Sequence, residues 1–153
     1  VALIGYGSIG SKVKANNIYS FLRKSDYSNV SNFDTLVVTV PPRGNDKLIG
    51  EKILSNFKGK LISVSRSNVI DNISLYKYID NITHAYVDTL DDHLRQYLID
   101  TGKVTYTKHT AFEYGFSYEN NTKYFDDLNS IIVDCLNNNV DKPILSRSER
   151  VTF

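Results

Sequence analysis

The sequence predicts an α/β fold in which a doubly wound parallel sheet carries helices on both faces, giving three layers. Short apolar runs alternate about six times with segments of helical spacing, an order typical of parallel strands joined by crossover helices. The first apolar run leads directly into a glycine-rich turn. With 153 residues, 41% of them hydrophobic and 23% charged, the chain has the size and composition of one globular domain.

The expected strands are apolar runs bounded by turn residues. The run at residues 1–4 is wholly apolar, as in a strand buried on both faces. The run at residues 35–40 is the clearest, and Pro41 and Pro42 stop it, because proline cannot donate to a central ladder. The six expected strands are residues 1–4, 18–22, 35–40, 61–64, 85–87 and 104–107.

The expected helices carry apolar residues three and four positions apart, the spacing of a buried helix face. Gly59 and Gly102 follow two of them and mark helix ends. Residues 23–32 are polar and are expected to form a loop. The expected helices are residues 8–17, a weak segment, then 45–57, 71–79, 91–99 and 118–138, the longest.

Composition and charge exclude several function classes. Eighteen Lys and Arg against 17 Asp and Glu give a formal charge of +1, which argues against a nucleic-acid binder. No apolar run approaches 18 residues, so no membrane span is expected. The lone Cys135 falls in an apolar helical stripe, where we expect it to pack, and it predicts a reducing, cytoplasmic compartment. No residues are assigned to a metal.

Gly5, Gly7 and Gly10 spell G-x-G-x-x-G between a strand and an expected helix. In this context Gly5 permits a tight turn, Gly7 lets the backbone approach a pyrophosphate, and Gly10 allows the helix to pack closely on the strand. The helix beginning at Ser8 and Ile9 would offer free N–H groups and a partial positive charge to phosphate. The motif therefore predicts a Rossmann-like dinucleotide site.

The end of the second expected strand bears on the choice of cofactor. Arg23, Lys24 and Ser25 follow it, and a guanidinium can bind a 2′-phosphate with two hydrogen bonds. This modestly favours NADP over NAD, while the nearby Asp26 would instead suit the free ribose hydroxyl of NAD. Gly5 and Arg23 are only 18 positions apart, so either the first helix is short or residues are missing within positions 13–17.

Seven patches, in order and at approximate spacing, resemble the nucleotide-binding domain of the D-isomer-specific 2-hydroxyacid dehydrogenases. The resemblance extends over residues 1–143. The patches are VALIGYGSIG at 1–10, VVTVPP at 37–42, LIG at 48–50, LISVSR at 61–66, VID at 69–71, AYVD at 85–88 and KVTYTKHTA at 103–111.

The resemblance implies roles for residues that follow strands, where such sheets bind ligands. Arg66 matches the arginine that binds the substrate carboxylate, and His109 the histidine that is general acid and base. Asp88 matches the residue that contacts the nicotinamide carboxamide. The family's Glu-Pro step is missing, and Asp91 or Asp92 could replace its glutamate as the partner of His109.

Further residues depart from the family pattern or complete the cofactor edge. Ser67 and Lys108 stand where the family has glycine and proline, and His93 occupies the nominal glutamate position. Val40, Pro41 and Ser65 follow expected strands and are assigned to cofactor binding.

The predicted function is hydride transfer between NAD or NADP and a small 2-keto or 2-hydroxy acid. The alternative is a dinucleotide-binding module without catalysis, acting as a sensor or subunit. Residues 1–138 would form the nucleotide-binding domain, and 139–153 a tail that could return to a substrate domain. Because the chain lacks Met and begins at Val1, we expect residues ahead of it. A homodimer through the 118–138 helix is a further expectation.

Overall fold

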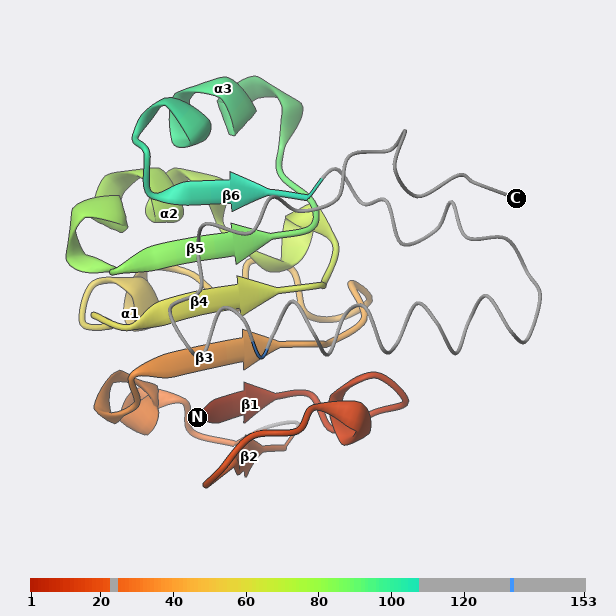
Figure 1. Ribbon diagram of the computed structural model, residues 1–153. Helices are drawn as coiled ribbons and strands as arrows, with labels where there is room; N and C mark the ends of the chain where they lie inside the picture. The colour runs from red at the N-terminus through yellow and green to blue at the C-terminus, as the bar shows by residue number, and fades with distance from the viewer. Residues whose placement is uncertain (23–24, 108–132, 134–153) are drawn as a thin grey trace, which may run out of the picture.

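The computed structural model describes residues 1–22, 25–107 and 133. Its centre is one six-stranded sheet in which every pair of neighbouring strands is parallel, and the strand arrows in Figure 1 all point the same way. The strands are β1 Ala2–Ile4, β2 Tyr19–Phe21, β3 Thr35–Val38, β4 Lys60–Ser63, β5 His84–Val87 and β6 Val104–Tyr106. All six expected strands are therefore present.

The strands lie in the order β2-β1-β3-β4-β5-β6. The chain runs outward from β1 to β2, returns to pair β3 with the other side of β1, and then continues outward to β6. The strand order thus reverses between β1 and β3, and ligands of open α/β sheets bind beyond the carboxyl ends of the strands at such a switch point. The doubly wound fold is confirmed.

One face of the sheet is covered by helices. These are α1 Glu51–Leu54, α2 Asn72–Tyr78 and α3 Asp92–Asp100. Leu54, Leu75 and Leu98, one from each helix, are fully buried, and they belong to a single core with Leu36 and other side chains of this face. At about 1.5–3 kcal/mol for each fully buried leucine, this burial is the main attraction between the helices and the sheet.

The opposite face carries a second apolar cluster. Leu3, Val37, Ile62 and Tyr86 lie side by side in register on β1, β3, β4 and β5, and all are at most 6% exposed. Val13 packs against them from the β1–β2 connection. Both faces of the central strands are therefore buried, as the continuous apolar runs predict.

The expected helix at residues 8–17 is wrong. Only a 3₁₀ turn, η1 Gly10–Lys12, forms there. Val13 then adopts an extended conformation, with φ −63° and ψ 125°, and is buried against the sheet. Asn17 takes a left-handed φ of 57° just before β2. Because the chain must return to the start of β2 within so few residues, it cannot continue a helix.

The expected helix at residues 45–57 is also mostly wrong, since α1 is one turn long. Lys47 has a left-handed φ of 52°, and Ile49 forms an isolated parallel bridge with Ile70. The Ile49 N–H donates to the Val69 carbonyl oxygen at 3.0 Å. These backbone groups bond across to the next segment, so they are not available to a helix.

The remaining connections differ less from expectation. The expected loop at residues 23–32 contains the 3₁₀ helix η2 Ser28–Asn32, which buries Val30 completely. Two more 3₁₀ helices, η3 Ser67–Val69 and η4 Ile79–Asn81, flank α2. The expected 118–138 helix, the domain boundary at residue 138, Cys135 and the 139–153 tail lie outside the described residues. No helix in the described part of the chain is long and apolar enough to cross a membrane.

Candidate functional site

The glycine turn after β1 lies at the switch point and is packed tightly against the end of β3. Gly5 has a φ of +99°, and a Cβ there would meet the Val40 Cγ1 atom at 2.8 Å. A Cβ on Gly10 would lie 1.9 Å from the Gly5 carbonyl oxygen. Side chains are therefore excluded at both positions by the protein's own backbone and neighbours.

Gly7 is different from these two glycines. A Cβ there would meet no heavy atom within 4 Å, and its φ is not in the left-handed region. The residue is exposed at the carboxyl edge of the sheet. Neither packing nor backbone conformation of the described chain requires glycine at this position, whereas a ligand lying against the backbone would require it.

Thr39 holds the glycine turn in place. Its hydroxyl donates to the Gly5 carbonyl oxygen at 2.6 Å, and its backbone N–H donates to the Ile4 carbonyl oxygen at 2.9 Å. The side chain is buried, with 8% of the residue exposed. Sequence reasoning did not select Thr39, although a polar residue at the end of an otherwise apolar strand was the available signal.

The turn does not lead into an α-helix, so the predicted helix N-terminus at Ser8 and Ile9 is wrong. Ser8 is exposed and Ile9 precedes the three-residue turn η1. A single 3₁₀ turn lacks the aligned peptide dipoles of a longer helix. Any phosphate at this turn would be held by backbone groups and shape, without the electrostatic contribution that the sequence pattern led us to expect.

The ends of β3, β4 and β5 are joined by side-chain hydrogen bonds through Ser65. The Val40 N–H donates to Ser65 Oγ at 3.0 Å, and Ser65 Oγ donates to the Val38 carbonyl oxygen at 3.3 Å. Thr89 Oγ1 donates to the Ser65 carbonyl oxygen at 2.7 Å. The structure thus brings two predicted cofactor residues, Val40 and Ser65, into contact, with Pro41 exposed beside them.

Asp88 follows β5 at the same edge and is 8% exposed. Its backbone N–H donates to the Ser63 carbonyl oxygen at 2.9 Å. The Thr107 hydroxyl, from the end of β6, donates to Asp88 Oδ1 at 2.8 Å. The Asp88 carboxylate, which the sequence predicted as a site residue, therefore accepts a hydrogen bond from Thr107, which the sequence did not predict.

At the end of β2 the chain turns sharply. The Ser25 N–H donates to the Leu22 carbonyl oxygen at 3.0 Å. Both carboxylate oxygens of Asp26 accept hydrogen bonds from Ser28, Oδ1 from its N–H and Oδ2 from its hydroxyl, each at 2.9 Å. The hydrogen bond from the Ser28 N–H, followed by that from its hydroxyl, lowers the pKa of Asp26. Asp26 thus serves as the cap of a local turn.

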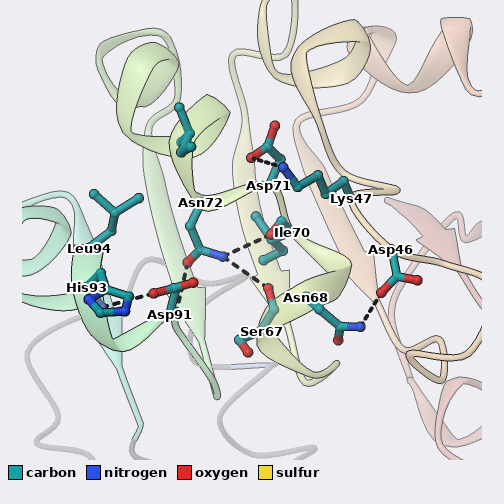
Figure 2. A pocket seen from close by; sticks show the side chains of 11 residues that line it. Asp46, Lys47, Ser67, Asn68, Ile70, Asp71, Asn72, Asp91, His93 and Leu94 are labelled. Carbon is teal, nitrogen blue, oxygen red and sulfur yellow. Dashed lines mark hydrogen bonds and ion pairs between the residues drawn. The ribbon is translucent and has the colours of Figure 1, made fainter.

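A pocket of about 470 Å³ opens among the segments that follow β3, β4 and β5. Figure 2 shows Asn72 at its centre, with its amide nitrogen toward Ser67 and Ile70 and its amide oxygen toward Asp91. The donated bonds to the Ser67 and Ile70 carbonyl oxygens are 3.0 and 2.9 Å, and the Asp91 N–H donates to Asn72 Oδ1 at 3.2 Å. The lining residues are Asp46, Lys47, Ser67, Asn68, Ile70, Asp71, Asn72, Ile73, Asp91, His93 and Leu94.

The two candidate carboxylates differ in their surroundings. Asp91 lines the pocket and caps α3, accepting a hydrogen bond from the His93 N–H at 2.9 Å. Asp92 forms an exposed ion pair with Arg95. Arg66 lies at the start of η3 and is exposed. Asp91 is thus the only one of the predicted catalytic residues that lines this pocket within the described part of the chain.

Three predicted site residues, Arg23, Lys24 and His109, lie outside the described residues. Among those described, Gly5, Gly10, Val40, Ser65 and Asp88 form one continuous edge from β1 to β5. No group of three His, Cys, Asp or Glu side chains within residues 1–22, 25–107 and 133 is arranged to hold a metal ion.

Comparisons with known proteins identify the fold. Neither protein-family models nor curated proteins give a match, but many solved structures do. An acyclic imino acid reductase, in complex with NADPH and D-Arg, is 24% identical with a TM-score of 0.63, and the match covers 90% of this chain and 50% of that one. The match shows that the two chains share a fold.

Two more structures lead to the same conclusion. The NAD complex of a D-isomer-specific 2-hydroxyacid dehydrogenase from Lactobacillus delbrueckii ssp. bulgaricus is 22% identical with a TM-score of 0.63, over 98% of this chain and 55% of that one. An NADPH-dependent glyoxylate/hydroxypyruvate reductase from Sinorhizobium meliloti, with NADP and malonate, is 19% identical with a TM-score of 0.62, over 88% and 49%. The chain spans about half the length of each, and the fold implied by the sequence resemblance is confirmed.

Proposed function

We propose that residues 1–138 form the NAD(P)-binding domain of an oxidoreductase of the D-2-hydroxyacid dehydrogenase type. The observation that carries this proposal is the open space beside Gly7 at the β1/β3 switch point. Gly5 and Gly10 are explained by protein packing, but Gly7 is not. A pyrophosphate lying against the Gly7 backbone explains it.

The residues of the carboxyl edge fit a dinucleotide. Gly7, Ser8 and Ile9 would hold the pyrophosphate, and Val40, Pro41 and Ser65 would line the path toward β5. Asp88 would accept a hydrogen bond from the nicotinamide carboxamide, since a carboxylate is an acceptor and the amide a donor. When bound, the nicotinamide ring supplies or accepts the hydride.

The substrate in this proposal is a small 2-keto or 2-hydroxy acid. Arg66 would hold its carboxylate with two charge-assisted hydrogen bonds, and His109 would donate a proton to the ketone oxygen as negative charge develops there. Asp91 or Asp92 would orient His109. The D-Arg and malonate in two of the similar structures are small carboxylic acids, which supports this class.

We also propose that NADP is preferred over NAD. Arg23, Lys24 and Ser25 follow β2, where a 2′-phosphate would lie. The residue that would instead bind a free 2′-hydroxyl is Asp26. Both of its carboxylate oxygens accept hydrogen bonds from Ser28. One similar structure contains NADPH and another contains NAD.

Calorimetric titration of the chain with NADH and NADPH tests dinucleotide binding. We expect dinucleotide affinity to fall progressively in Gly7→Ala and Gly7→Val. The melting temperature should stay unchanged, because a Cβ at Gly7 would meet no heavy atom beyond its chain neighbours within 4 Å. Gly102→Ala is the control for the opposite outcome, a loss of stability with no loss of binding. Gly102 has φ +71° in the turn between α3 and β6, so its replacement should lower stability without affecting binding. Absence of binding by the wild type, or full binding by a folded Gly7→Val variant, would contradict the proposal.

One observation favours the alternative of a non-catalytic dinucleotide-binding module. Both candidate partners of His109 already have structural roles, Asp91 as the cap of α3 and Asp92 in its pair with Arg95. A module would bind cofactor but show no turnover with a panel of 2-keto acids, whereas the enzyme would oxidise NADPH or NADH.

A homodimer and a cytoplasmic location, the latter supported by the lone Cys135, remain predictions.

A further inference from the structure

One side-chain hydrogen bond at the carboxyl edge, from the Thr107 hydroxyl to Asp88, has no role in the proposed function. Thr107 comes directly after β6, and its backbone N–H donates to the Val87 carbonyl oxygen at 3.0 Å, extending the parallel ladder by one bond. Its hydroxyl then turns to Asp88 Oδ1, 2.8 Å away. The ladder bond fixes the Thr107 backbone and leaves its side chain a few staggered rotamers; in the one observed, the hydroxyl lies 2.8 Å from Asp88 Oδ1 and 3.5 Å from the Val87 carbonyl oxygen.

The Thr107 hydroxyl is one of the contacts that orient the Asp88 side chain. The carboxylate is nearly buried and follows β5 directly. The second torsion of an aspartate side chain is soft and has broad minima. A hydroxyl donor on one oxygen restricts that torsion, and with it the plane in which the carboxylate can accept other hydrogen bonds.

We propose that Thr107 is a positioning residue for the nicotinamide end of the cofactor, acting through the Asp88 carboxylate. This inference rests on the proposed function, in which Asp88 accepts a hydrogen bond from the carboxamide. In this role Thr107 acts on the cofactor only through its hydrogen bond to Asp88. Its removal therefore weakens only those ligands that carry the nicotinamide group.

The test compares NADH with ADP-ribose, which lacks nicotinamide, by calorimetric titration of the 153-residue chain. Thr107→Val keeps the side-chain shape and removes the hydroxyl. We expect NADH affinity to fall roughly fivefold to tenfold, the effect of about one net hydrogen bond, while ADP-ribose affinity stays within about twofold. Thr107→Ser restores the hydroxyl and should restore NADH affinity.

Thr105→Val is the matched control on the same strand. The Thr105 hydroxyl lies 2.9 Å from His84 Nε2, so this variant also loses a β5–β6 side-chain hydrogen bond, but away from Asp88. It should leave the ratio of NADH to ADP-ribose affinity unchanged. Thermal unfolding is followed for each variant, and Thr107→Ala replaces Thr107→Val if the latter does not fold.

A double-mutant cycle tests whether Thr107 acts through Asp88. Asp88→Ala should itself weaken NADH binding more than ADP-ribose binding, and adding Thr107→Val should then cause no further selective loss. Equal weakening of both ligands by Thr107→Val, no rescue by serine, or an undiminished effect in the Asp88→Ala background would overturn the inference. Wild-type protein that binds ADP-ribose as tightly as NADH would overturn it while leaving dinucleotide binding intact. Wild-type protein that binds neither would overturn the proposed function first.

Discussion

The two sides of the sheet about β1 are built differently. Residues 5–18 connect β1 to β2 with only the 3₁₀ turn η1, whereas an α-helix lies in each connection from β3 to β6. On the first side, contacts with the backbone hold the glycine turn in place. Gly10 packs against the Gly5 carbonyl oxygen, and the Thr39 hydroxyl donates to that same oxygen. On the second side, apolar burial of Leu54, Leu75 and Leu98 holds the helices in place.

This difference shows that a glycine turn can be positioned without a following α-helix. A neighbouring strand supplies the hydrogen bonds, and the absence of two Cβ atoms supplies the space. The side that would hold the cofactor phosphates is therefore sensitive to single added methyl groups. The other side carries Arg66, Asp91 and Asp92 and is held mainly by buried apolar side chains.

Gly10→Ala should destabilise the fold more than any other alanine substitution in the glycine turn. The added Cβ would lie 1.9 Å from the Gly5 carbonyl oxygen, so backbone must move, at a cost of about 2–4 kcal/mol. Chemical denaturation measures this cost. Gly7→Ala is the control and should change stability by less than about 0.5 kcal/mol. Equal costs for the two variants would contradict the account of the turn.

His109→Ala should lower kcat by about 10²-fold or more in the full-length protein, the usual contribution of a general acid. Arg66→Ala should act chiefly on KM if its ion pair forms equally in the ground and transition states. Steady-state oxidation of NADPH or NADH with a 2-keto acid separates the two effects. An unchanged kcat in His109→Ala would assign the proton transfer to another group.

Arg23→Ala should remove most of the preference for NADPH over NADH. A charge-assisted contact to the 2′-phosphate contributes roughly 1.5–3 kcal/mol, or about tenfold or more in affinity. Titration with both cofactors gives the ratio directly, and Asp26→Asn is the companion variant that should leave it nearly unchanged. If the wild type binds NADH more tightly than NADPH, Asp26 is the residue that contacts the ribose, and the assignment of Arg23 is wrong.

Asp91→Ala should cost about 1 kcal/mol of stability, because Asp91 caps α3. Asp92→Ala should cost less than about 0.5 kcal/mol, since its pair with Arg95 is exposed. Asp91→Asn and Asp92→Asn then separate capping from catalysis. The variant that neutralises the true partner of His109 should lower the pKa of that histidine, measured from the pH profile of kcat/KM. A pH profile unchanged in both would remove both carboxylates from the mechanism.

The smallest effect concerns His84, at the amino end of β5. Burial, together with the charge of Lys60, lowers the pKa of His84 below its ordinary value. The unfolded chain therefore binds this proton at a higher pH than the folded chain, so stability should fall as pH drops through about 6.5. His84→Gln should flatten that dependence in denaturation experiments between about pH 7.5 and 5.5. If the stability of the variant depended more steeply on pH than that of the wild type, the direction assigned to the His84 pKa shift would be wrong.

The position of the strands and the identity of the glycine motif could be predicted from the sequence. Apolar runs such as residues 35–40, stopped by Pro41, are local signals, and a strand buried on both faces needs little else. Gly5 was predicted for a tight turn, and its φ is +99°; Gly10 was predicted for close packing of a helix, and it packs instead against the Gly5 carbonyl oxygen. Seven matching patches also predicted the fold that the structural comparisons confirm, although identity is at most 24% in the structures described.

The lengths of the helices and the contacts between the strand ends were decided only by the tertiary structure. Residues 8–17 and 45–57 carry helical spacing, but the short return to β2 and the bridge from Ile49 to Ile70 use their backbone differently. Thr39 lies 34 positions from Gly5, and Thr107 lies 19 positions from Asp88. Periodicity reports only which residues are buried within one segment. It carries no information about which hydroxyl will meet which acceptor, because that depends on the order in which parallel strands are laid side by side.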